Sequence, residues 1–333
     1  MKAAYYRQPG PPDVIEYGEL PSPRCGPHQV VVRTSAVSVN PIDTYIRAGW
    51  IEHPAPRPTI VGCDAAGIVS EVGDQVRGFH LGDRVWTTNQ GLLGRQGTFA
   101  EFSAVDEQWV YPLPNTVPFE AAAACALVGV TAHLGLFQRA QIQPKQIICI
   151  QGASGGVGLM VIQMAKWAQA KVIALAGSEK KCEHCKNFGA DIALNYRQAD
   201  LGARLRAVAP AGVDLFWTTS RQPDFDLMIA ALAERGTIVL MAGRDARPTF
   251  PVGPFYFKQC RMAGVVMFKA TPAELDKAAT DISRWLADGT LRAPIAVRLP
   301  LSQAAEAHRL QQAATVDLTQ ELLGKIVLTP DSV

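Results

Sequence analysis

The stretch Ile147 to Gly158, with the sequence IICIQGASGGVG, joins a run of apolar residues to a glycine-rich turn. The run lacks the alternation of polar and apolar residues that marks a half-exposed strand, so it predicts a buried parallel strand. After the turn, apolar residues recur at helical spacing from Val157 to Ala165. A strand, a glycine turn and a helix in this order open a dinucleotide-binding βαβ unit, where free N–H groups and the helix dipole meet a pyrophosphate. A plain tight turn would explain the glycines alone, but the flanking pattern favours nucleotide binding.

Strand and helix patterns alternate on both sides of this unit. The pattern predicts helices at 157–168, 179–188 and 226–233. The expected strands cover residues 147–150, 171–176, 192–194, 213–218, 237–242 and 262–268. This alternation predicts a doubly wound α/β domain, in which helices cover both faces of a parallel sheet.

The first 120 residues have a different character. They are rich in valine, glycine and proline, and their short apolar runs are separated by turn signals. Several short strands broken in this way predict a compact, barrel-like β domain. Residues 120–137 are alanine-rich and helical in pattern, 276–287 form a further helix, and 324–328 predict a last strand that returns to the first domain.

Length and composition limit the possible classes. A chain of 333 residues exceeds the size at which one hydrophobic core usually stops growing, so two domains are expected. The net charge of +2, without a basic block, argues against a nucleic-acid or membrane surface. No secretory leader is recognised, and no segment is judged to approach the roughly 18 apolar residues of a membrane span. A cytoplasmic protein is expected.

The seven cysteines are scattered and odd in number, and several lie in apolar runs. Reduced core thiols are therefore expected rather than a disulfide framework. The pair Cys182 and Cys185 has no second pair at zinc-finger spacing, although a structural zinc site needs four ligands. No metal site is expected there.

Four segments carry a family resemblance: NPIDTYIRAG at 40–49, GCDAAG at 62–67, GDRV at 82–85 and GASGGVG at 152–158. They resemble the medium-chain dehydrogenase/reductase superfamily, and within it the zeta-crystallin group of quinone oxidoreductases. The resemblance implies a GroES-like, β-rich catalytic domain at 1–126 and 269–333 and a Rossmann NADPH-binding domain at 127–268. It also implies an active site in the cleft between the domains and a homodimer paired through the Rossmann sheets.

Zinc-dependent relatives are the main competitor within that superfamily. Matched to their pattern, the catalytic ligand positions fall on Asn40, Cys63 and Leu127. Only the cysteine could bind zinc, whereas catalytic zinc normally needs three ligands of the Cys, His or carboxylate kind. The lobe that carries four cysteines in those relatives is also missing. The resemblance therefore implies a reductase without zinc.

The end of the second Rossmann strand bears on the choice of cofactor. NAD-binding domains usually place an acid there to hold the ribose 2′-OH, and Ala176 takes that position here. Ser178 and Lys181 could bind a 2′-phosphate instead, and Tyr196 matches the family position whose hydroxyl meets it. Glu179 leaves an alternative open, because it could bind the 2′-OH or oppose the phosphate. NADPH is the expected cofactor.

The turn and the strand ends supply the remaining cofactor contacts. The resemblance implies a threonine facing the nicotinamide at Thr131 and backbone groups that close over the cofactor at Gly243 and in the stretch 265–268. The complete expected set is Thr131, Ala153, Ser154, Gly155, Gly156, Val157, Gly158, Ser178, Lys181, Tyr196, Gly243, Val266 and Phe268.

Hydride transfer to an electron-poor carbonyl compound calls for a hydrogen-bond donor near the carbonyl oxygen. Asn40 and Tyr45 are the candidate donors, and Asp43 is expected to brace their segment or the nicotinamide ribose. Alternatively, Asn40 only begins a turn and Tyr45 only packs.

The function expected first is an NADPH-dependent quinone reductase. Reduction of α,β-unsaturated carbonyls or enoyl thioesters is an alternative on the same fold, because specificity resides in the pocket. A cofactor-binding structural or RNA-binding protein of zeta-crystallin type is an alternative of another class. No nucleic-acid partner is expected, given the charge.

Overall fold

The computed structural model describes residues 1–333 except 53, 55–56 and 332–333. The chain divides into two compact units. Unit 1 comprises Met1–Val130 with Phe268–Val333, and unit 2 comprises Thr131–Met267. Each unit has its own β-structure and its own hydrophobic core.

Unit 1 is built on β-sheets. Among its described residues, one seven-stranded sheet has the order β15-β16-β3-β5-β6-β8, with β7 paired to β3, and a smaller sheet has the order β2-β1-β4. The strands are β1 (Lys2–Tyr6), β2 (Glu16–Glu19), β3 (Gln29–Ser38), β4 (Thr59–Ile60), β5 (Asp64–Val72), β6 (Arg84–Thr87), β7 (Phe102–Asp106), β8 (Val110–Pro112), β15 (Ile295–Pro300) and β16 (Lys325–Thr329). Because β16 pairs with β3, the prediction that the last strand returns to the first domain is confirmed.

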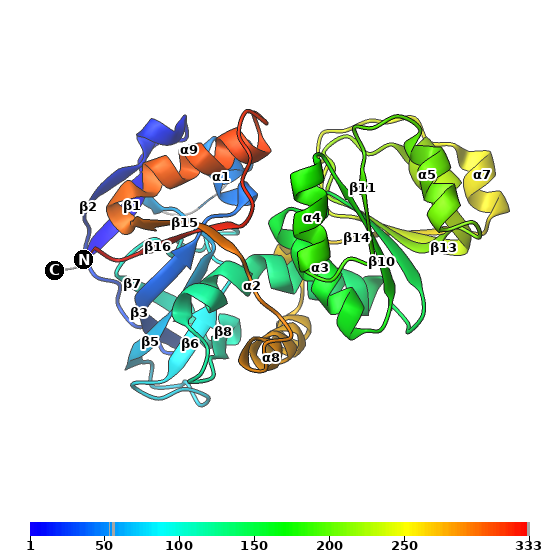
Figure 1. Ribbon diagram of the computed structural model, residues 1–333. Helices are drawn as coiled ribbons and strands as arrows, with labels where there is room; N and C mark the ends of the chain where they lie inside the picture. The colour runs from blue at the N-terminus through cyan, green and yellow to red at the C-terminus, as the bar shows by residue number, and fades with distance from the viewer. Residues whose placement is uncertain (53, 55–56, 332–333) are drawn as a thin grey trace. The chain divides into compact units, whose positions relative to one another are not determined.

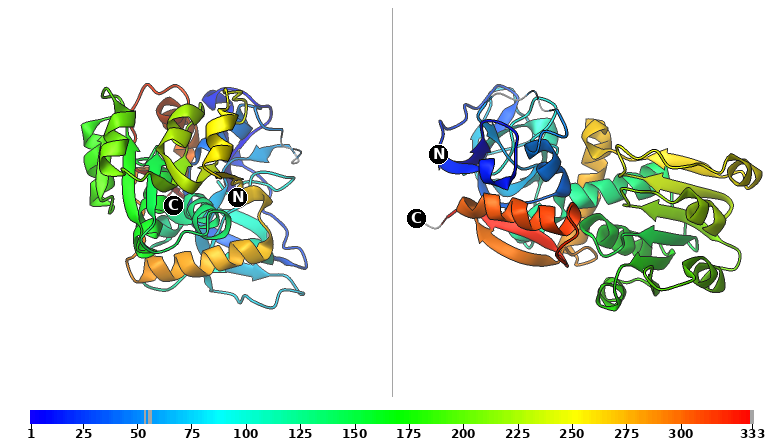
Figure 2. Two further views of the ribbon diagram at one scale, coloured as in Figure 1. Left: turned by 90° about the vertical axis from the view of Figure 1, so that its right-hand side faces the viewer. Right: turned by 90° about the horizontal axis from the view of Figure 1, so that it is seen from above.

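Helices close the sheets of unit 1. They are α1 (Pro41–Arg47), the first part of α2 (Phe119–His133), α8 (Pro272–Ala287) and α9 (Ala304–Thr315). Helix α9 lies against β15 and β16, as Figure 2 shows, and it also contacts α1. The amino-terminal strands and the carboxyl-terminal helix therefore share one core, which includes Tyr6, Phe99, Ala307 and Leu328.

Unit 2 is a doubly wound parallel sheet, as predicted (Figure 1). In the part of the chain that the structure describes, its six strands have the order β11-β10-β9-β12-β13-β14, and all adjacent pairs are parallel. The strands are β9 (Ile147–Gln151), β10 (Lys171–Ala176), β11 (Ile192–Asn195), β12 (Val213–Thr218), β13 (Leu232–Leu240) and β14 (Arg261–Gly264). Helices α3 (Gly156–Trp167) and α4 (Glu179–Asn187) cover one face, and α5 (Leu201–Val208), α6 (Phe225–Ala231) and α7 (Val252–Phe257) belong to the other.

The bounds of two strands differ from the prediction by more than one residue. Strand β13 begins at Leu232 rather than at residue 237, because Leu232 already pairs with Val213 across a bulge in the ladder. Strand β14 ends at Gly264 rather than at residue 268, because the chain turns into a 3₁₀-helix over Met267–Lys269. The apolar run at 262–268, which predicted a longer strand, therefore contributes residues to both β14 and the 3₁₀-helix.

One expectation about hydrophobic segments was wrong. Residues Phe119–Arg139, which form α2 and a following π-helical turn, have the length and mean hydropathy (1.5) of a membrane-spanning helix. In the structure, 83% of the most apolar window is buried inside the protein. A helix that is apolar on all sides is either a membrane span or a buried helix of a protein core. Because this helix is buried, it belongs to the core.

Candidate functional site

The glycine turn connects β9 to α3 and presents the start of that helix. Gly152 has φ +76°, and a Cβ atom there would lie 2.0 Å from Thr219 Oγ1. A Cβ atom at Gly158 would lie 2.5 Å from the carbonyl oxygen of Gly152, so only glycine lets the helix approach the turn this closely. Gly155 is the N-cap residue and supplies no side-chain cap, which leaves the first N–H groups of α3 available to an anion. The turn therefore fits a dinucleotide pyrophosphate.

Polar side chains gather where β10 ends. A Cβ atom at Gly177 would lie 2.6 Å from Tyr196 Oη and 3.6 Å from Arg197 Nε, so the hydroxyl and the guanidinium both lie over this glycine. Ser178 caps α4 by accepting a hydrogen bond from the Lys181 backbone N–H at 3.3 Å. The structure thus brings three predicted residues, together with Arg197, to the strand end where a ribose 2′ substituent is expected.

Glu179 has partners of its own beside these residues. Its Oε1 atom accepts hydrogen bonds from Asn195 Nδ2 at 3.0 Å and from Gln198 Nε2 at 2.9 Å. The carboxylate is therefore held by one amide at the end of β11 and one in the loop that follows. This arrangement disfavours the alternative in which Glu179 binds a ribose 2′-OH.

The other predicted cofactor residues of unit 2 follow the carboxyl edge of the sheet. The ladder places Gln151, Thr218, Leu240 and Gly264 side by side at the ends of their strands. The turn at 152–158, Gly243 and Val266 come directly after these ends, and Val266 is exposed. Thr131 lies in α2 at the start of unit 2 and is buried, whereas Phe268 belongs to unit 1.

The start of α1 in unit 1 is fixed by a buried polar network. The Asn40 backbone N–H donates to Asp43 Oδ2 at 2.8 Å. The Asn40 side-chain amide donates to Asp64 Oδ2 at 2.7 Å and to the Ser38 carbonyl at 3.4 Å, while its Oδ1 accepts from Lys325 Nζ at 2.5 Å. In this arrangement both amide hydrogens of Asn40 are used inside the domain.

Asp64 and Lys325 are the charged centre of that network. The Asp64 carboxylate accepts hydrogen bonds from Asn40, from Thr88 Oγ1 at 2.7 Å and from the Leu127 backbone N–H at 3.3 Å. Lys325 Nζ also donates to the Val39 carbonyl at 2.7 Å. Burial raises the pKa of Asp64 and lowers the pKa of Lys325, whereas their mutual attraction opposes both shifts.

Asp43 and Cys63 form a second buried contact beside this centre. Cys63 Sγ donates to Asp43 Oδ1 at 2.7 Å, and both residues are buried. Burial is the main cause that raises the pKa of Asp43 to about 7, and the neighbouring Asp64 adds to it, while the hydrogen bond from Cys63 lowers it. Burial, followed by the charges of Asp43 and Asp64, raises the pKa of the Cys63 thiol, so Cys63 is held as a neutral thiol.

Comparison with known proteins identifies the superfamily. Residues 26–115 match the "Alcohol dehydrogenase GroES-like domain" family, and residues 156–284 match the "Zinc-binding dehydrogenase" family. The quinone oxidoreductase of Rattus norvegicus is 30% identical over 312 residues, which cover 92% of this chain and 93% of that protein. The chain belongs to the medium-chain dehydrogenase/reductase superfamily.

Solved structures of the superfamily match over nearly the whole chain. An NAD-dependent alcohol dehydrogenase is 31% identical with a TM-score of 0.90, and 99% of this chain and 100% of that chain are covered. The Escherichia coli quinone oxidoreductase, solved in complex with NADPH, is 27% identical with a TM-score of 0.87 over 99% and 100% of the two chains. The resemblance found in the sequence is confirmed, and this superfamily member is an oxidoreductase of the quinone oxidoreductase type.

The three positions that the sequence resemblance matched to catalytic zinc ligands, Asn40, Cys63 and Leu127, lie at the buried network. Asn40 and the Leu127 N–H contact Asp64, and Cys63 contacts Asp43. The described residues contain no group of three His, Cys, Asp or Glu side chains that could hold a metal ion. The cation among these residues is the ammonium group of Lys325.

Tyr45 lies apart from the network on α1. It is half-buried, and its ring stacks on that of Trp50 with centroids 5.5 Å apart and an angle of 21° between the planes. Because residues two apart on a helix face opposite sides, Tyr45 faces away from Asp43. The structure therefore brings Asn40 and Asp43 together, and it places Tyr45 on the other face of α1.

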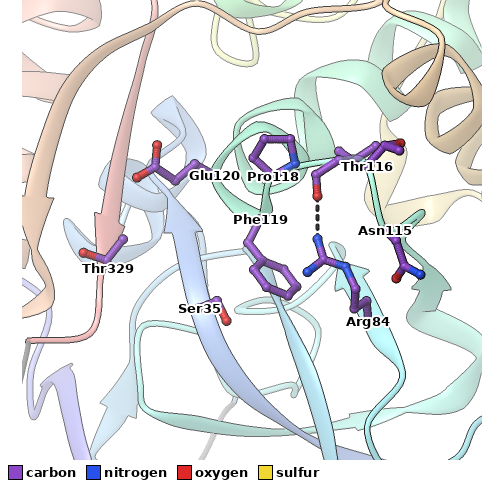
Figure 3. Close-up of a pocket in the computed structure, with 9 residues that line it drawn as sticks. Ser35, Arg84, Asn115, Thr116, Pro118, Phe119, Glu120 and Thr329 are labelled. Carbon is purple, nitrogen blue, oxygen red and sulfur yellow. Dashed lines mark hydrogen bonds between the residues drawn. The ribbon is translucent and has the colours of Figure 1, made fainter.

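A surface hollow of about 450 Å³ in unit 1 does not involve the predicted residues (Figure 3). Arg84 lies over the Phe119 ring, 3.9 Å from its centroid, and donates a hydrogen bond to the Val117 carbonyl. The hollow is also lined by Ser35, Glu120 and Thr329. None of the titratable side chains that line this hollow indicates a catalytic role.

Sequence analysis missed three partners in the network: Asp64, Thr88 and Lys325. Asp64 lies in the GCDAAG segment, and Lys325 lies in the last predicted strand. A charged residue inside an otherwise apolar strand pattern is a signal of a buried partner, and it was available in both segments.

We predict that Asp43→Asn changes the pH dependence of stability. An ordinary aspartate titrates near 4 and Asp43 titrates at about 7, so the folded protein binds more protons than the unfolded chain between these values. The contribution of Asp43 to the free energy of unfolding therefore falls as pH rises from about 4 to about 7. The variant should show a flatter decline in that window than the parent, measured by urea unfolding at stepped pH. Asp74→Asn, at an exposed aspartate, is the control, and parallel curves for Asp43→Asn and the parent would refute the assignment.

Proposed function

We propose that this protein is a zinc-independent, NADPH-dependent reductase that transfers hydride to quinones. The observation that carries the proposal is the buried network at the positions of the zinc ligands. There, the Asn40 amide and the Leu127 backbone N–H donate hydrogen bonds to the Asp64 carboxylate, and Lys325 supplies the positive charge. The names of the relatives support quinones as the acceptors.

The preference for NADPH is proposed from the end of β10. Tyr196 and Arg197 lie over Gly177, and Glu179 is held by two amides. A phosphate on the ribose would meet a hydroxyl, a guanidinium and the side chain of Lys181 there. The NADPH bound in the Escherichia coli quinone oxidoreductase is consistent with this choice.

When bound, the nicotinamide supplies a hydride to the acceptor. In the proposed mechanism, the first N–H groups of α3 would hold the pyrophosphate, and the turn at 152–158 would fix its position. Tyr45 donates a hydrogen bond to the acceptor oxygen on which negative charge develops. Asn40 and Asp43 act through the network, because they fix the start of the helix that carries Tyr45. A quinone gains the hydride and one proton, and it leaves as the hydroquinone.

Lys181→Ala should weaken the preference for NADPH. Loss of one charge-assisted contact to the 2′-phosphate, of about 1.4 kcal/mol, would lower the NADPH-to-NADH ratio of kcat/KM by about tenfold. Lys180→Ala, at the exposed neighbouring lysine, is the matched control and should leave the ratio unchanged. If Lys181→Ala kept the parent ratio, the phosphate contact would be assigned to the wrong residue.

A panel of acceptors tests the reaction itself. The protein should oxidise NADPH with 1,4-benzoquinone and 9,10-phenanthrenequinone faster than with 2-cyclohexenone or a crotonyl thioester. Rapid reduction of the enone or the thioester without quinone turnover would replace the proposal by reduction of α,β-unsaturated carbonyls. Tight NADPH binding without turnover of any acceptor would instead favour a structural or RNA-binding protein.

We also propose a homodimer that pairs through the sheet of unit 2. Strand β14 is one of the two edges of that sheet, and apolar side chains of Tyr256, Phe257, Met262 and Val266 are exposed on or near it. An open strand edge with apolar neighbours favours strand pairing with a second copy. The native mass should be twice 35.9 kDa.

Met262→Glu tests this interface, because it adds a charge at the paired edge and should shift the protein to monomers. Leu81→Glu is the control, since Leu81 is an exposed apolar residue of unit 1. A monomeric parent protein, or a Met262→Glu variant that remained dimeric at the same concentration, would argue against this interface.

A further inference from the structure

Arg47 carries a buried guanidinium group with two nitrogen atoms left unpaired. The residue is 1% exposed, and its Nη2 donates to Gln312 Oε1 of α9 at 2.7 Å. Its Nε and Nη1 atoms have no hydrogen-bond partner among the described residues. A buried, unpaired guanidinium N–H is costly, so these two donors require an acceptor.

The neighbouring His308 adds no charge to this region. Its ring is fully buried against Phe99, and both ring nitrogens are unpaired among the described residues. Burial, followed by the charge of Arg47, lowers the pKa of His308 to about 3. The imidazole is therefore neutral, and the positive charge of this region remains on Arg47.

A small cavity adjoins Arg47 on the side of Asp43. It has a volume of about 10 Å³ and is lined by Asp43 and Arg47 together with Tyr6, Thr59, Gly62 and Gly91. A volume of about 10–15 Å³ accommodates one water molecule, provided that two to four polar groups face it. Asp43 and Arg47 are four residues apart on α1, so their side chains share one face of the helix.

The balance of charge decides between a neutral guest and an anion. Both oxygens of Asp43 accept hydrogen bonds, from Cys63 and from the Asn40 N–H, which is the pattern of an ionised carboxylate. Above pH 7, where Asp43 is ionised, Asp43 and Asp64 are negative and Lys325 and Arg47 are positive, so the buried region is neutral. An anion would leave it with a net negative charge in a low-dielectric interior, which favours water.

We propose that this cavity holds one ordered water molecule, which accepts hydrogen bonds from the Arg47 guanidinium and donates one to the Asp43 carboxylate. The two residues then form an ion pair separated by a single water. Such a bridge is nearly as favourable in enthalpy as a direct hydrogen bond. Through Gln312, it also links the NPIDTYIRAG segment to α9.

A crystal structure of the parent protein, grown above pH 7 with sodium bromide as the salt, tests the occupant directly. The expected result is a density peak within hydrogen-bond distance of Arg47 and of the Asp43 carboxylate, with no anomalous bromine signal. An anomalous peak there would show that the occupant is an anion and not water. A high-resolution electron-density map with no peak in the cavity would overturn the proposal.

A double-mutant comparison tests the link in solution without depending on turnover. Arg47→Met and Asp43→Asn should each lower Tm, and the double variant should lose less than the sum of the two, because each single change removes the same bridge. Arg47→Lys keeps the charge and should lose less than Arg47→Met. Strictly additive losses would show that the two side chains are not coupled. If the variants fail to fold, the crystallographic result on the parent protein still decides.

Discussion

The contact between Asp64 and Asn40, with Lys325 beside it, is the constraint on which the β-rich unit depends. A carboxylate and an ammonium group are buried together, and burial of charge is tolerated only when every hydrogen-bonding group is satisfied. Here the partners come from the end of β3, the start of α1, the strand β5, the end of β6, the helix α2 and the strand β16. Segments 285 residues apart in sequence are therefore fixed to one another by the same few atoms.

This constraint explains how one short helix can serve two purposes. The inner face of α1 carries Asp43 and Arg47, which are buried and belong to the packing of unit 1. The outer face carries Tyr45, which stacks on Trp50. Because the inner face is held by directional hydrogen bonds, the position of the outer face is determined as well. A side chain with a preorganised backbone loses less entropy when it meets a ligand.

The sequence predicted the Rossmann unit better than the candidate site, for physical reasons. A buried parallel strand is encoded locally by a continuous apolar run, so 171–176 and 213–218 were predicted with the bounds that β10 and β12 have. No local sequence pattern encodes the network. Asn40 was recognised from its segment, but its contacts with Asp64 and Lys325 form only when distant strands pair. Nor could the sequence reveal that the Asn40 amide is used inside the domain, since that depends on where the carboxylate points.

The end of β10 shows why the identity of a residue near a cofactor is weaker evidence than its contacts. An acid in this region is commonly associated with the ribose 2′-OH, and Glu179 raises that alternative from sequence alone. In the structure, the amides of Asn195 and Gln198 meet its carboxylate, while Tyr196 and Arg197 lie over Gly177. Both amides and both donors come from the end of β11 and the loop that follows it. In the proposed NADPH site, cofactor discrimination would therefore depend on two strand ends together, and a change at residues 195–198 would alter it even if residues 176–181 stayed the same.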